Sequence, residues 1–152
     1  MERHAFRTPQ GDIAYWVSRE SRPDRPWLVF LPGLTADHRL FNPQIAAFEG
    51  KANFLVWDAP SHGESRPFEL TWTLDDLARW LHGILRQEGI KRPVLVGQSM
   101  GGYTAQAFLD LFPGQAAGFI SIDSAPLKRR YFHGWEIWAL RHTRLMYLSI
   151  PW

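Results

Sequence analysis

The chain has 152 residues, 45% of them hydrophobic and 21% charged, which is the composition of a globular domain with a buried core. It contains no cysteine, which excludes disulfides and thiolate metal sites and fits a reducing compartment. No apolar run is long enough to span a bilayer, and residues 1–7 lack the apolar stretch of a secretory signal. We therefore expect a cytoplasmic protein with no integral membrane segment.

The net charge of +2 is unevenly distributed along the chain. Residues 1–126 hold 12 Lys and Arg against 14 Asp and Glu, whereas residues 127–152 hold 5 against 1. In the second segment the basic residues are interleaved with large apolar ones, a pattern more typical of a solvated helix face than of a nucleic-acid patch. We expect no nucleic-acid partner.

Apolar runs alternate with amphipathic segments through the first 126 residues. Alternating stretches predict half-buried strands, continuous apolar runs predict strands buried on both faces, and a 3.6-residue apolar repeat predicts a helix. In chain order the predicted elements are a hairpin over 4–8 and 13–18 with Gly11 and Asp12 at its turn, a strand over 27–31, a helix with a weak start over 37–48, a strand over 53–57, a helix over 74–87 with a capping box at Thr73 and Asp76, a strand over 93–97, a helix that includes 104–109 and stops at Pro113, and a strand over 118–122. This order predicts a mostly parallel α/β sheet with helices on both faces.

Ser99 lies in the pattern Gly97-Gln98-Ser99-Met100-Gly101, between a strand-length apolar run and a helix-forming run. A serine on so tight a turn has a strained backbone, and the residues two before and two after it come too close to carry side chains. Its hydroxyl stands clear of the sheet at a helix N-terminus, whose dipole favours developing negative charge. Phosphate-loop and dinucleotide fingerprints are absent. The pattern therefore predicts a nucleophile elbow with Ser99 as the nucleophile and Gly97 and Gly101 as its glycines.

Three motifs resemble those of the α/β-hydrolase fold superfamily. Pro32-Gly33-Leu34 is similar to its oxyanion loop, with proline in place of the usual histidine. The segment 58–65 is similar to its Asp-x-x-Gly-x-Gly-x-Ser loop, with Ser61 at the first glycine, and the third motif is the elbow. The resemblance extends over residues 1–126 and implies that Ser99 attacks an acyl carbonyl while the backbone N–H groups of Leu34 and Met100 bind the oxyanion. It implies no metal and no cofactor.

The rest of a catalytic triad is not evident from the sequence. The family places its acid and then its histidine at later strand ends, after a helical cap, and we expect residues 127–152 to be the start of that cap. A final packing helix is the alternative. Asp123 is a candidate acid because some relatives carry the acid after this strand, although a polar turn residue is the simpler interpretation. None of the six histidines occupies the position expected of the base; they are His4, His38, His62, His82, His133 and His142.

We interpret the chain as the N-terminal part of a serine hydrolase that acts on an apolar carboxylic ester or a related small acyl substrate. Because an unaided serine is a weak nucleophile, the chain alone is expected to be inactive. Two alternatives stay open: a non-catalytic binding or interaction module on the same fold, and one half of a split enzyme. The expected partners are the substrate, a complementing C-terminal segment, or a second copy of the chain.

Overall fold

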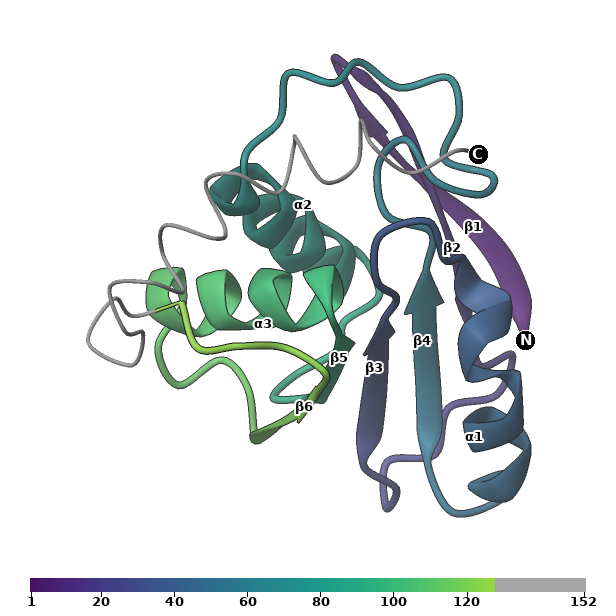
Figure 1. Cartoon of the computed structure of the whole chain (residues 1–152). Helices are drawn as coiled ribbons and strands as arrows, with labels where there is room; N and C mark the ends of the chain where they lie inside the picture. The colour runs from purple at the N-terminus through teal and green to yellow at the C-terminus, as the bar shows by residue number, and fades with distance from the viewer. Residues whose placement is uncertain (128–152) are drawn as a thin grey trace.

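The structure, a computed structural model, describes residues 1–127. Within them lies a six-stranded sheet with the strand order β1-β2-β4-β3-β5-β6 (Figure 1). Its strands are β1 (Glu2–Thr8), β2 (Gly11–Val17), β3 (Trp27–Leu31), β4 (Asn53–Trp57), β5 (Val94–Gln98) and β6 (Gly118–Ile122). β3, β4, β5 and β6 run parallel, and the antiparallel hairpin β1–β2 joins them at β4. The mostly parallel α/β sheet predicted from the sequence is confirmed.

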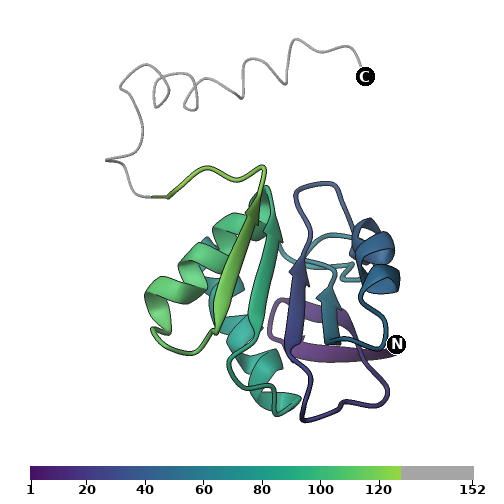
Figure 2. The ribbon, with the colours of Figure 1, turned by 90° about the horizontal axis from the view of Figure 1, so that it is seen from below.

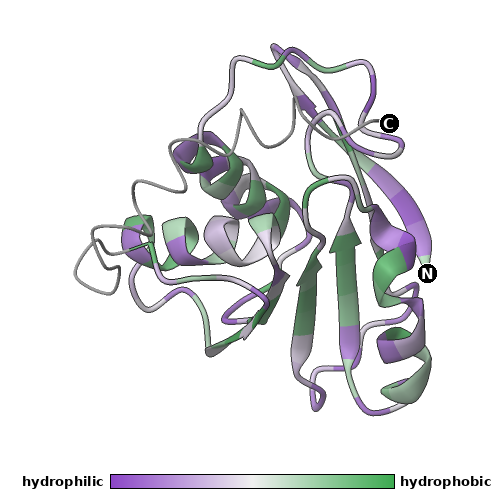
Figure 3. Ribbon diagram, in the orientation of Figure 1, coloured by the Kyte–Doolittle hydropathy of each residue, from purple (hydrophilic) through white to green (hydrophobic). Residues whose placement is uncertain are grey.

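Helices cover both faces of this sheet. The helices are α1 (Asn42–Ala47), α2 (Leu74–Gln87) and α3 (Met100–Leu111), and a 3₁₀ helix (His38–Phe41) precedes α1. Figures 1 and 2 show α2 and α3 on one side and α1 on the other. Each side has its own apolar core, and β3 and β4, which contribute to both, are mostly green in Figure 3. Strands buried on both faces need this continuous apolar sequence.

The boundaries of α2 follow the sequence prediction. The Thr73 hydroxyl accepts a hydrogen bond from the Asp76 N–H at 3.3 Å, and the Asp76 carboxylate accepts one from the Thr73 N–H at 2.9 Å. The predicted capping box is therefore present. Leu77, Leu81 and Ile84 recur at helical spacing and are fully buried, so one stripe of α2 packs on the sheet.

Two predicted elements differ in detail. The hairpin turns at Pro9–Gln10 rather than at Gly11–Asp12, because Gly11 already pairs with Thr8 and accepts a hydrogen bond from the Thr8 hydroxyl at 2.8 Å. The helix predicted over 37–48 is divided into the 3₁₀ helix and α1. Pro43 explains the division, since proline has no N–H to continue a helix and is tolerated only in a first turn.

The predicted start of a helical cap over 127–152 lies outside the described residues, apart from Leu127. The described part ends beside β6, which is the last strand in the sheet order. Ile120 on β6 is 50% exposed, so apolar surface lies next to backbone groups that no further described strand pairs. Such an edge is a template for association with another chain.

We expect the 152-residue chain expressed alone to self-associate through this edge. Ile120→Lys should shift it toward the monomer, because a charge on an edge strand opposes strand pairing. Leu70→Lys is the matched control, since Leu70 is 79% exposed on the loop before α2. Size-exclusion chromatography with light scattering measures the outcome. A compact monomer from the unmodified chain would contradict the prediction.

Candidate active site

Ser99 occupies the corner between β5 and α3. Its φ of 49° and ψ of −115° put it among conformations that residues with side chains rarely adopt. Strained residues of this kind cost about 1–3 kcal/mol and persist only where the surrounding structure holds them. The sequence predicted a strained serine at this turn, and the backbone has that geometry. The Ser99 side chain is half-buried, at the carboxyl end of the parallel strands.

The glycines around Ser99 are required by close packing. A Cβ atom on Gly97 would lie 2.5 Å from the carbonyl oxygen of Gly101, inside the first turn of α3. A Cβ atom on Gly101 would overlap the carbonyl of Leu31 at the end of β3. The N-terminus of α3 therefore rests directly on the neighbouring strand. Gly102, which we did not single out from the sequence, is equally restricted, because a Cβ atom there would overlap the Ser124 side chain.

The loop after β3 passes directly beside Ser99. A Cβ atom on Gly33 would overlap the Gln98 Oε1 and lie 3.0 Å from the Ser99 Cβ, so a side chain at position 33 would crowd both residues. Leu34 follows with its side chain 56% exposed. Among residues 1–127, the backbone N–H groups of Leu34 and Met100 donate no hydrogen bond. The predicted oxyanion loop and the elbow are thus neighbours, and both bring an unpaired backbone donor to this region.

The end of β6 is tied to the backbone of the elbow. Ile122 pairs with Gln98 in parallel register, so Asp123 and Ser99 follow their strands at the same level of the sheet. The Ser99 N–H donates to the Ile122 carbonyl at 2.9 Å, and the Ser124 hydroxyl donates to the Ser99 carbonyl at 2.8 Å. Asp123 is exposed, and its φ is 50°. Its carboxylate makes no hydrogen bond to another described residue.

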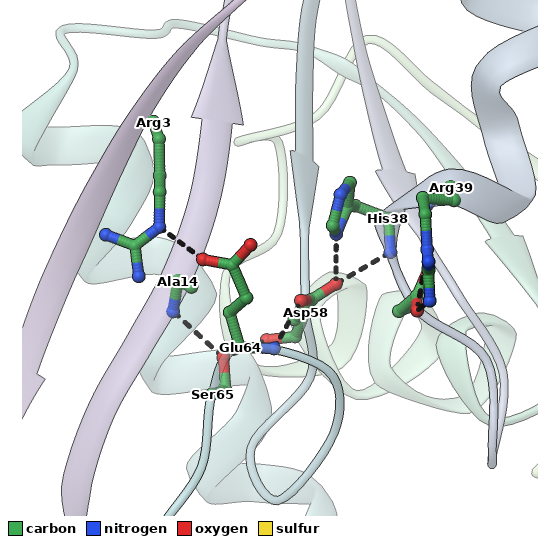
Figure 4. A network of polar contacts seen from close by, with 8 residues as sticks. Arg3, Ala14, His38, Arg39, Asp58, Glu64 and Ser65 are labelled. Carbon is green, nitrogen blue, oxygen red and sulfur yellow. Dashed lines mark hydrogen bonds and ion pairs between the residues drawn. The ribbon is translucent and has the colours of Figure 1, made fainter.

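The loop over 58–65 is built around a buried carboxylate (Figure 4). Asp58 is fully buried; its Oδ1 accepts from the His38 N–H at 2.6 Å, and its Oδ2 accepts from the Glu64 N–H at 2.7 Å. Ser65 is also fully buried, and its hydroxyl donates to the Asp58 carbonyl at 2.7 Å. Ser61, at the family's first glycine, has a φ of 70°. The loop acts as a structural brace that holds these strand ends together. The Ser65 hydroxyl is used within it, because it donates to Asp58 and accepts from the Ala14 N–H.

His38 links this brace to the segment that follows the predicted oxyanion loop. Its Nδ1 lies 2.9 Å from the Asp58 Oδ1, and its ring stacks on Trp16 with centroids 3.5 Å apart. The sequence did not indicate this pairing, because it depends on how two loops meet at adjacent strand ends. Asp37, His38 and Asp58 place ligand atoms within 4.8 Å of one another. The Arg39 guanidinium, however, holds the Asp37 carboxylate and lowers its pKa to about 2, so hydrogen bonds and ion pairing account for the cluster without a metal.

The four histidines among the described residues have other partners. His4 lies 2.9 Å from Glu88, and the buried His62 places its Nδ1 2.9 Å from the Pro60 carbonyl. His82 stacks on Phe112 at 4.0 Å, and burial lowers its pKa. None of these, nor His38, forms a hydrogen bond with Ser99 in the described part of the chain. His133 and His142 lie outside it.

A mostly parallel sheet with a strained serine at a strand-to-helix corner and a glycine loop beside it defines the α/β-hydrolase class of fold. The chain belongs to the alpha/beta hydrolase fold family, whose sequence pattern matches residues 26–142. It is 37% identical over 100 residues to 3-oxoadipate enol-lactonase 1 of Acinetobacter baylyi, covering 66% of this chain and 36% of the relative. It is 34% identical over 93 residues to a 2-succinyl-6-hydroxy-2,4-cyclohexadiene-1-carboxylate synthase of Serratia proteamaculans, covering 61% and 36%.

The solved structure of naproxen esterase (carboxylesterase NP) from Bacillus subtilis has the same fold, with a TM-score of 0.72 and 25% identity over 93% of this chain and 50% of that one. The chain thus spans about a third of the length of the curated relatives it matches. No helix among residues 1–127 has the length and apolar character needed to cross a membrane.

The packing at the elbow predicts a steep cost for Gly101→Val. The new side chain would overlap the Leu31 carbonyl, and we expect a loss of roughly 3 kcal/mol or more of folding free energy. Gly118→Val on β6 is the control, because the nearest atoms to its Cβ would be 3.9 Å away. Proteolysis in increasing urea compares the two variants with the parent chain. Equal resistance of Gly101→Val and the parent would show that the tight corner is absent.

Proposed function

We propose that this chain carries the nucleophile and the oxyanion hole of a serine hydrolase that acts on small, apolar carboxylic esters or lactones. The observation that carries the proposal is the strained Ser99 between the first turn of α3 and the Gly33 loop. Backbone strain is costly, and it is commonly retained where it orients a reacting group. Membership of the alpha/beta hydrolase fold family supports the same function.

The chemistry follows from the positions of the backbone donors. The Ser99 Oγ attacks the acyl carbon, its proton passes to a general base, and the carbonyl oxygen becomes an oxyanion. The N–H groups of Met100 and Leu34 donate to that oxyanion, and the α3 dipole adds to its stabilisation. The leaving alcohol takes the proton from the base, and water then releases the acyl group by the same route. Gly33 is essential here because it lets the loop approach Ser99.

The base must come from outside the described residues, since no histidine among them is hydrogen-bonded to Ser99. The relatives extend well beyond the region matched by this chain. We propose that a C-terminal segment supplies the histidine, as a continuation of the chain or as a partner. Asp123 is the candidate acid, because its strand ends level with Ser99 and its carboxylate is exposed and free of described partners.

The substrate class rests on the relatives' names. One curated relative is an enol-lactonase and one similar structure is a carboxylesterase, so both names specify an acyl–oxygen bond. The synthase in the same group shows that the fold also serves other reactions. Esters and lactones are among the acyl substrates whose cleavage uses both a serine nucleophile and an oxyanion hole. The sequence of 127–152 is rich in aromatic residues, and if this segment begins a cap, as we propose, it favours an apolar acyl group.

A non-catalytic binding module is the second candidate function. It is favoured by the free Ser99 side chain, whose hydroxyl makes no hydrogen bond to another described residue. A binding module, however, does not require a serine in a strained backbone conformation. The two functions differ in one measurable property, the reactivity of Ser99.

A chimera tests that reactivity. Residues 1–127 are fused to the part of 3-oxoadipate enol-lactonase 1 that follows its matched region, which we expect to complete the fold and to provide the base. We expect a fluorophosphonate probe to label Ser99, and Ser99→Ala to abolish labelling and to lower hydrolysis of p-nitrophenyl butyrate by at least about a thousandfold. Ser21→Ala, which alters an exposed serine on the loop before β3, is the control and should keep both activities.

Three outcomes are informative. Labelling that persists in Ser99→Ala would assign the nucleophile to another residue. A folded chimera that neither labels nor hydrolyses would favour the binding module. The 152-residue chain alone should remain at background in both assays, and hydrolysis by the chain alone would require one of its own histidines to be the base.

A further inference from the structure

We propose that Ser124 and Gln106 are positioning residues that clamp the segment after β6 onto the elbow and hold Ser99 in its reactive backbone conformation. The catalytic part of this inference rests on the proposed role of Ser99 as a nucleophile. The clamp itself is a structural claim that can be measured without turnover.

The first half of the clamp is the Ser124 hydroxyl. It lies 2.8 Å from the Ser99 carbonyl oxygen and 3.1 Å from that of Ile122. A hydroxyl has one hydrogen to donate, and the shorter contact assigns it mainly to Ser99. The Ser99 N–H meanwhile donates to the Ile122 carbonyl at 2.9 Å. Both backbone polar groups of the strained serine are therefore held by residues at the end of β6.

The second half is the Gln106 side-chain amide, which lies on α3 about two turns after Ser99. Its Nε2 donates to the Ala125 carbonyl at 3.0 Å, and its Oε1 accepts from the Leu127 N–H at 2.8 Å. A single amide thus pairs with two backbone groups of the outgoing segment, as a neighbouring strand would. The segment 124–127 is therefore fixed at one end to Ser99, which precedes α3, and at the other end to Gln106 within α3.

The fit between Gly102 and Ser124 supports a dedicated contact. A Cβ atom on Gly102 would overlap the Ser124 Oγ and lie 2.5 Å from its Cβ. Position 102 therefore carries no side chain where the Ser124 hydroxyl reaches the elbow. The Ser99 carbonyl also accepts from the Gly102 N–H at 2.9 Å, so Ser124 adds a donor to a carbonyl already used by the helix.

This arrangement has a mechanical consequence for Ser99. Its backbone conformation is unfavourable by itself, so it depends on these external hydrogen bonds. The same bonds fix the position of the segment after Asp123. A displacement of residues 124–127 would lengthen the hydrogen bond from the Ser124 hydroxyl to the Ser99 carbonyl. The reactivity of Ser99 therefore depends on where the segment after β6 is placed.

Hydrogen–deuterium exchange on the full 152-residue chain tests the clamp. Ser124→Ala should increase exchange in a peptide covering 95–104. Gln106→Glu keeps the side-chain length but replaces the Nε2 donor, which faces the Ala125 carbonyl, with a carboxylate oxygen that can only accept. This variant should increase exchange over 123–127. Ser21→Ala is the control, because Ser21 is exposed on the loop before β3 and its hydroxyl makes no hydrogen bond to another described residue. It should leave exchange over 95–104 unchanged.

Labelling kinetics on the chimera described above test the link to catalysis. Loss of one neutral hydrogen bond predicts a maximal fluorophosphonate labelling rate about fivefold lower in Ser124→Ala, with the half-saturating probe concentration unchanged. A purely structural role would lower the thermal midpoint and leave the rate per folded molecule at the parent value.

The failures of the two proposals are distinguishable. Exchange over 95–104 that is the same in Ser124→Ala and the parent would overturn the clamp, whatever the chimera does. An unchanged labelling rate in Ser124→Ala, with the parent labelled and Ser99→Ala unlabelled, would overturn the positioning role alone. A parent chimera that is never labelled would overturn the proposed nucleophile, and the exchange measurement would still decide the clamp.

Discussion

The close approach of α3 to β3 is the constraint on which the rest of the site depends. At Gly101 the helix backbone meets the Leu31 carbonyl with no room for a side chain. The buried residues that follow in α3, Gly102, Thr104, Ala105 and Ala107, are also small, and the first large buried residue of the helix is Phe108. Because the first turn of α3 packs directly against β3, a tight turn at Ser99 is needed to join the helix to β5. The unusual serine conformation is thus a geometric result of helix–sheet packing, and the adjoining hydrogen bonds offset its cost of about 1–3 kcal/mol.

A second constraint acts one strand further along the sheet. The buried Asp58 carboxylate accepts backbone N–H groups from two loops and lies beside the His38 ring, which is stacked on Trp16. A buried charge is tolerated only where donors surround it, so the two loops cannot separate without exposing Asp58. The segment that ends at His38 begins at Gly33, beside Ser99. Asp58 therefore stabilises the loop that begins at Gly33 from its far end, without touching Ser99.

The sequence predicted most accurately what depends on local chemistry. The bounds of α2 and β6, the capping box and the corner at Ser99 all follow from short-range patterns of capping residues, apolar repeats and glycines. The hairpin turn and the division of helix 37–48 were less accurate, because a pairing register and one proline decided them. The contact of His38 with Asp58 and that of Ser124 with Ser99 join residues 20 and 25 positions apart. Only the parallel register of adjacent strands brings them together, and no single motif contains both partners.

The strand order has a consequence for how the protein is made. β1 and β2 close one side of the sheet, β4 joins β2, β3 joins β4, and β5 and β6 are then added outward in chain order. A chain that leaves the ribosome from its N-terminus can add β5 and then β6 to an existing edge without opening any earlier pairing. The elbow forms late in this sequence, because the carbonyl that receives the Ser99 N–H belongs to Ile122, the last residue of the last described strand. The conformation of the serine is thus fixed only once synthesis has passed it by more than twenty residues.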